Sequence, residues 1–99
     1  MDKKLNQLLK EYVNNPEDPN TNLQLAFHYN DINQTAAAIS FYLRTAERSR
    51  DKQLQYECML KAASCFESQG MRSISVKGLL QHAISILPRR PEAYLSLST

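Results

Sequence analysis

Leu25-Ala26-Phe27-His28-Tyr29 and Ala62-Ala63-Ser64-Cys65-Phe66 are two versions of one pattern, and this pattern decides the fold. Each has an apolar residue followed by a small one, with an aromatic residue three positions later. The second version begins 37 positions after the first, and Leu97-Ser98 repeats its opening 35 positions after that. A small residue lets a second helix approach closely, and an aromatic side chain fills the space beside it. A repeat of this length predicts stacked helical hairpins.

The composition also favours helices. Of the 99 residues, 42% are hydrophobic, which is enough for the core of one small domain, and only two are glycines. No stretch alternates valine, isoleucine and threonine as a strand would. We therefore expect an all-α fold of about five helices and a truncated sixth.

Helical periodicity places these elements along the chain. The first helix carries an apolar stripe over 5–13 and ends at Asn14, because Pro16 forces the residue before it out of the helical region. A loop over 15–20 follows, and then helices over about 21–31, 36–50 and 52–69. A fifth helix begins near Ser73 or Ser75 and ends at Pro88, and the sixth follows Pro91. The expected helix caps are Asn20 or Thr21, Thr35 and, at a C-terminus, Gly70.

The spacing resembles the tetratricopeptide repeat, whose period is about 34 residues and whose pattern is W-x₂-L-G-x₂-Y…A-x₃-F…P. The first copy reads Asn22-x-x-Leu25-Ala26-x-x-Tyr29 and then Ala38-x-x-x-Tyr42. The second reads Met59-x-x-Ala62-Ala63-x-x-Phe66, then Val76-x-x-x-Leu80, and closes with Pro88. Tryptophan is absent, and alanine or serine replaces the glycine. The first copy lacks its closing proline, which predicts longer helices around Glu47 to Gln55.

The resemblance implies a right-handed α-hairpin solenoid that binds a protein or peptide without catalysis. Residues 1–18 would form a capping helix and loop, followed by repeats over 19–55 and 56–90 and a partial repeat over 91–99. In this family the first helix of each hairpin lines a concave groove. The groove candidates are Asn20, Leu23, Phe27, Asn30 and Asp31, then Glu57, Leu60, Ser64, Glu67 and Ser68, with Glu92 and Leu95 beginning the third repeat. The alternative for each polar candidate is the solvated side of a helix.

Two other functions stay open. The runs over 41–48 and 78–83 are similar to tetratricopeptide segments that accompany bacterial and phage glycosyltransferases, which implies an N-terminal accessory or oligomerisation module of a larger enzyme. A weak nucleic-acid binder would use Arg44, Arg48, Arg50 and Lys52. Acidic residues interleave with these cations and the net charge is only +2, so we expect no nucleic-acid partner.

The chain offers little for catalysis or metal binding. Glu57 and Glu67 are about 15 Å apart along one helix, farther than the roughly 5–9.5 Å of a glycosidase pair. His28 and His82 are isolated. Cys58 and Cys65 are about 10 Å apart along a helix, too far for a disulfide, and are expected in the core. We expect no enzyme activity, no metal and no cofactor.

The remaining expectations concern location and assembly. No apolar run reaches the roughly 18 residues of a membrane span, and the N-terminus lacks the apolar core of a secretory signal, so we expect a cytoplasmic protein. The apolar residues Ala93, Tyr94, Leu95 and Leu97 have no following helix to cover them. They predict either a fragment of a longer protein or self-association through the C-terminal helix.

Overall fold

A computed structural model describes residues 2–69 and 74–98, and every regular element in these ranges is a helix. The helices are α1 (Lys3–Asn14), α2 (Pro19–Asp31), α3 (Thr35–Arg48), α4 (Lys52–Ser68), α5 (Ile74–Ile86) and α6 (Pro91–Ser98). The all-α prediction is therefore confirmed. Gly70 and Ser73, the expected caps on either side of the fourth connection, lie outside the described residues.

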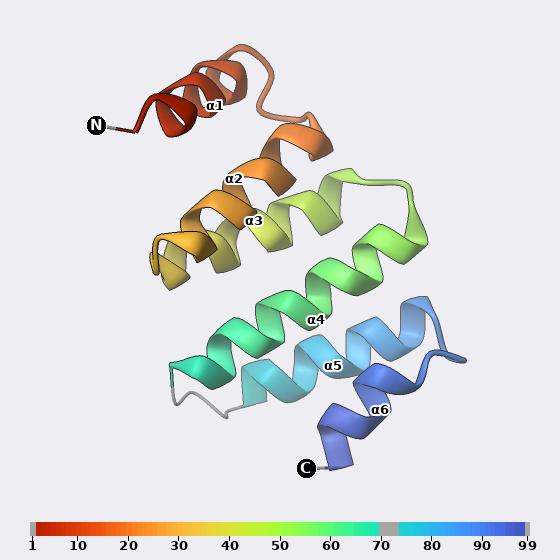
Figure 1. The fold of residues 1–99 in the computed structure, drawn as a ribbon. Coiled ribbons are helices and arrows are strands. Elements are labelled where there is room, and N and C mark those ends of the chain that lie inside the picture. The colour runs from red at the N-terminus through yellow and green to blue at the C-terminus, as the bar shows by residue number, and fades with distance from the viewer. Residues whose placement is uncertain (1, 70–73, 99) are drawn as a thin grey trace.

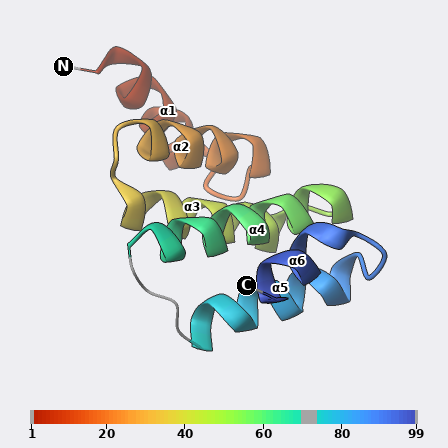
Figure 2. The same cartoon turned by 60° about the horizontal axis from the view of Figure 1, so that its bottom comes forward.

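The helices follow one another through space in chain order (Figure 1). Extensive contacts join consecutive helices, with α2–α3, α3–α4 and α4–α5 packed most closely. Figure 2 shows α1 at one end of the stack and α5 with α6 at the other. The principal extents of the molecule are 41, 29 and 17 Å.

Two clusters of buried residues form the core, and α4 contributes to both. The first joins α2, α3 and α4 through Ala26, Ala38, Ile39, Tyr42, Ala46, Cys58, Ala62 and Cys65. The second joins α4, α5 and α6 through Tyr56, Ala63, Val76, Leu80, Ala83 and Ala93. The half-buried Tyr29 packs on the first cluster and stacks on Phe41 with ring centroids 5.7 Å apart. Phe66 packs on both clusters, so both repeat aromatics face inward.

The N-terminus of α2 differs from the prediction. Asp18 caps this helix by accepting a hydrogen bond from the backbone N–H of Asn20 at 3.2 Å, and Pro19 is its first residue. The expected caps, Asn20 and Thr21, thus lie inside the helix. Proline is favourable at the first helical position because its missing N–H has no partner there in any case.

The connection between α3 and α4 is also different. The third helix ends at Arg48, two residues earlier than expected, so the predicted lengthening is wrong for α3. The fourth helix begins at Lys52, as expected, and has 17 residues. Asp51 accepts hydrogen bonds from the backbone N–H groups of Gln53 and Leu54, at 3.0 and 3.4 Å. Such a cap begins a new helix, so the extra residues form a connection over 49–51.

The first helix lies beside α2 and α3. Asp2 caps it and contacts the imidazole of His28 on α2. Near its other end the Tyr12 ring meets Phe41 edge-on at 5.4 Å, and the Arg44 guanidinium lies 5.2 Å from the same ring. These contacts hold α1 against the outer side of the first helix pair.

The two cysteines allow a direct test of the core. Both are free and buried, as expected, and burial raises the pKa of the Cys58 thiol to about 11. A thiol reacts as its thiolate. In the variant Cys65→Ser, we therefore expect Cys58 to resist Ellman's reagent at pH 8 until denaturant unfolds the chain, as followed by thionitrobenzoate release. Rapid stoichiometric labelling of the native protein would contradict this burial.

Candidate functional site

One face of the molecule is built from α2, α4 and α6. Residues 53, 57, 60, 61, 64 and 68 of α4 recur at intervals of three and four, so they share one side of that helix. On the other side of α4, Gln55 and Met59 line a hollow together with residues of α3 and α5. The helix α4 therefore separates two surfaces. We call the surface formed with α2 and α6 the groove; it contains two hollows.

The α2–α4 hollow is polar and has a volume of about 210 Å³. Its lining residues are Asn30, Tyr42, Lys61, Ser64, Cys65 and Ser68. The Cys65 thiol lies 3.7 Å from Oδ1 of Asn30, and the Ser68 hydroxyl donates to the Cys65 carbonyl at 2.8 Å. Burial raises the pKa of Cys65, so its thiol is a neutral donor. Amide, hydroxyl and ammonium groups give this hollow hydrogen-bonding capacity.

The α4–α6 hollow combines acidic and apolar groups in about 270 Å³. Its lining residues are Gln53, Tyr56, Glu57, Leu60, Lys61 and Glu92. The buried Tyr56 hydroxyl donates to the Glu92 carboxylate at 3.1 Å and accepts the N–H of Ala93 at 3.1 Å. Tyr56 therefore ties the beginning of α6 to α4.

Lys61 separates the two hollows and lines both. Its Nζ lies 5.7 Å from the centroid of the Phe27 ring, a cation–π distance. Phe27 is 37% exposed, and its ring also meets Tyr42 edge-on at 6.0 Å. An exposed apolar ring thus lies beside the cation that lines both hollows.

The structure brings together part of the predicted site. Asn30 and Ser64 share one hollow, Glu57 and Leu60 share the other, and Phe27 lies beneath Lys61. Neither hollow is lined by the predicted groove residues Asn20, Leu23, Phe27, Asp31 and Glu67. Leu23 is half-buried against the first core cluster, and the other four are exposed.

Sequence reasoning missed Gln53, Tyr56 and Lys61. A signal for Lys61 was present, because it follows Glu57 by four positions and therefore lies on the same side of α4. Its contact with Phe27 depends on how α2 packs against α4, which the spacing within one helix does not specify.

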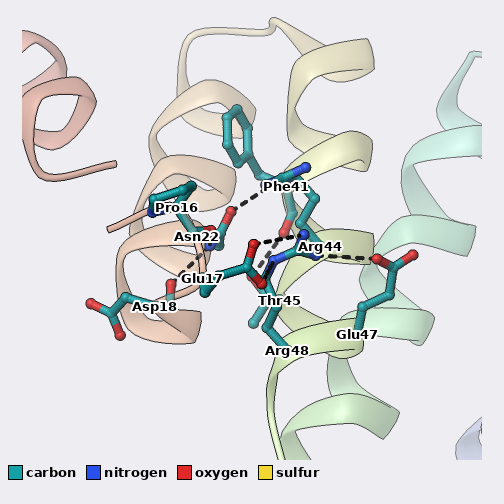
Figure 3. Close-up of polar contacts among 9 residues, drawn as sticks. All are labelled: Pro16, Glu17, Asp18, Asn22, Phe41, Arg44, Thr45, Glu47 and Arg48. Atoms are coloured by element: carbon teal, nitrogen blue, oxygen red, sulfur yellow. Dashed lines mark hydrogen bonds and ion pairs between the residues drawn. The ribbon is translucent and has the colours of Figure 1, made fainter. Parts of the chain in front are cut away.

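Two cations of the basic stretch, Arg44 and Arg48, contact other side chains of the chain (Figure 3). The Arg48 guanidinium forms ion pairs with Glu17 at 2.8 Å and with Glu47 at 3.2 Å. Arg44 donates to Oδ1 of Asn22 at 3.3 Å and lies over the Tyr12 ring. Two of the four cations that the nucleic-acid alternative would use are thus engaged within the chain, while Arg50 and Lys52 are exposed.

Other kinds of site find no support among the described residues. Over 2–69 and 74–98, no group of three or more histidine, cysteine or acidic residues is arranged to hold a metal ion. Within the same ranges, none of the helices has the length and apolar character needed to cross a membrane.

No protein-family model, no curated protein and no solved structure matches the chain. The groove between α2, α4 and α6 is therefore the basis for assigning a function.

Proposed function

We propose that this chain is a tetratricopeptide-type helical solenoid whose groove binds an extended segment of a protein partner, without catalysis. The helices that would be the first members of hairpins, α2, α4 and α6, contribute all of the lining residues except Tyr42 of α3. The order of helix contacts along the chain supports the solenoid arrangement. Each hairpin of such a repeat covers the apolar face of its neighbour.

The observation that carries the proposal is the arrangement around Lys61. An exposed aromatic ring, Phe27, lies on one side of it and the half-buried Leu60 precedes it, with a polar hollow toward α2 and an acidic hollow toward α6. Peptide-binding surfaces combine such apolar anchors with a few directional polar groups. Affinity would come from Phe27 and Leu60, and direction along the groove from Asn30, Ser64 and Glu57.

Fewer observations support the other functions that the sequence left open. No specific contact in the described residues favours an accessory module of a glycosyltransferase. Within the basic stretch, nucleic-acid binding would rely on its two exposed cations, Arg50 and Lys52. Self-association through α6 stays a prediction. The Leu95 side chain on that helix is 64% exposed. Location in the cytoplasm also stays a prediction.

Replacing Phe27 or Leu60 with alanine is expected to weaken peptide binding by about fivefold or more, because central apolar anchors carry most interface energy. Peptides would be selected by display of short random sequences against the full chain, and their affinities measured by fluorescence anisotropy. Far-UV circular dichroism would verify that each variant keeps its helices.

The matched control is Val13→Ala. Val13 is 77% exposed on α1, so this variant also removes a surface apolar side chain but lies outside the groove. Its peptide affinity should equal that of the wild type. The proposal is wrong if no peptide is enriched, or if Val13→Ala weakens binding as much as Phe27→Ala and Leu60→Ala.

A further inference from the structure

Two carboxylates and one cation stand among the side chains that line the α4–α6 hollow. Glu57 and Glu92 supply two carboxylates, and Lys61 is the one cation among its lining residues. The Arg90 guanidinium lies beside the hollow, 2.7 Å from the Gln53 amide oxygen. The two carboxylates among the lining side chains favour a ligand group with positive charge.

Both carboxylates are held by neighbouring side chains. The Tyr56 hydroxyl donates to Glu92, and burial raises the pKa of Tyr56, so the hydroxyl stays a proton donor at neutral pH. The Gln53 amide donates to Glu57 at 3.1 Å, and its oxygen accepts from the Arg90 guanidinium at 2.7 Å. Groups already held in place lose less conformational entropy when a ligand binds.

The other features of the hollow suit a long basic side chain. Leu60, half-buried against the second core cluster, offers an apolar surface between the acidic groups and Lys61. Lysine and arginine side chains cover such surfaces with their aliphatic stems and keep the charged end among polar groups. Lys61 itself is directed to the Phe27 ring on the α2 side, which leaves the carboxylates to an incoming cation.

We propose that the α4–α6 hollow receives an arginine side chain of the bound protein segment, with Glu57 and Glu92 contacting its guanidinium and Leu60 its stem. This inference rests on the proposed peptide-binding function and adds the chemistry of one position in the partner. Arginine fits better than lysine because its planar group makes several directed hydrogen bonds to carboxylates at once.

The test compares two peptide pools on the full chain. The pools have the same randomised flanking positions and differ at one central residue, which is arginine in one and its neutral isostere citrulline in the other. We expect the arginine pool to bind about tenfold more tightly, with backbone amide shifts at Glu57, Leu60 and Glu92 in nuclear magnetic resonance titrations. The variant E57Q/E92Q should remove this preference.

A matched double variant, E11Q/E47Q, removes two exposed carboxylates outside the groove and should keep the preference for arginine. Lys61→Gln should raise the affinity for the arginine pool, because it removes a repelling charge.

The inference is overturned if citrulline binds as well as arginine, if E57Q/E92Q retains the preference, or if Lys61→Gln weakens arginine binding. Groove binding without an arginine preference would leave the proposed function standing. Absence of binding by both pools would overturn the proposed function and this inference together.

Discussion

Replacing Tyr42 with alanine is expected to lower the free energy of unfolding by about 3–5 kcal/mol, the range for truncating a large aromatic side chain in a packed core. Tyr42 is 1% exposed and belongs to the first core cluster. Many of its neighbours there are alanines, on α2, α3 and α4. Small side chains cannot move to fill the cavity, so the cost should reach the upper part of the range. Urea unfolding followed by circular dichroism measures it.

Tyr42→Phe is the matched control because it keeps the ring and removes the hydroxyl alone. The cost of this variant should stay within about 1.5 kcal/mol, because removing one hydroxyl costs at most about as much as one hydrogen bond contributes. If Tyr42→Ala costs no more than Tyr42→Phe, then the ring does not fill the space between the three helices. The account of how the small residues pack would then be wrong.

The core was the most predictable part of this chain. Leu25, Ala26, Ala62 and Ala63 were selected for an apolar–small pattern at a repeat spacing, and all four are buried. Residue size limits how closely two helices can approach, so the pattern predicts which residues lie between packed helices. Helix type and order followed from the same periodicity.

Helix ends were less predictable because several residues can cap the same helix. Asn20, Thr21 and Asp18 are all suitable caps for α2, and Asp18 with Pro19 takes the position. At the end of α3 the sequence lacks a proline, yet the helix stops at Arg48. Asp51 caps the next helix, and α3 therefore ends before it. This boundary depends on two neighbouring segments, so a motif within one of them does not predict it.

The groove was predictable along α4 and less so across helices. Glu57, Leu60 and Ser64 follow from helical spacing, and each lines a hollow. Leu23 was assigned to the groove by the same reasoning, but it packs against the core because α2 faces two neighbours. The role of Tyr56 depends on α6, whose residues lie more than 30 positions away in the sequence.

Asn22 is a buried polar residue near the start of α2. It lies where the proposed tetratricopeptide pattern has tryptophan, and it is fully buried. Its amide donates to the carbonyl oxygens of Pro16 and Asp18 at 3.0 and 2.8 Å and accepts from Arg44 (Figure 3). The side chain therefore joins the loop before α2 to α3.

Asn22→Ala is expected to lower the free energy of unfolding by about 2–4 kcal/mol, because a buried group that loses its partner costs roughly 1–3 kcal/mol. The Pro16 carbonyl would lose the amide as a donor, and Arg44 would lose its acceptor. Urea unfolding gives the change. The control is Asn20→Ala, in the same helix, where the side chain is exposed and the cost should stay within about 0.5 kcal/mol. If the two variants lower the free energy of unfolding equally, then Asn22 does not connect the loop to α3 and its buried amide does not stabilise the fold.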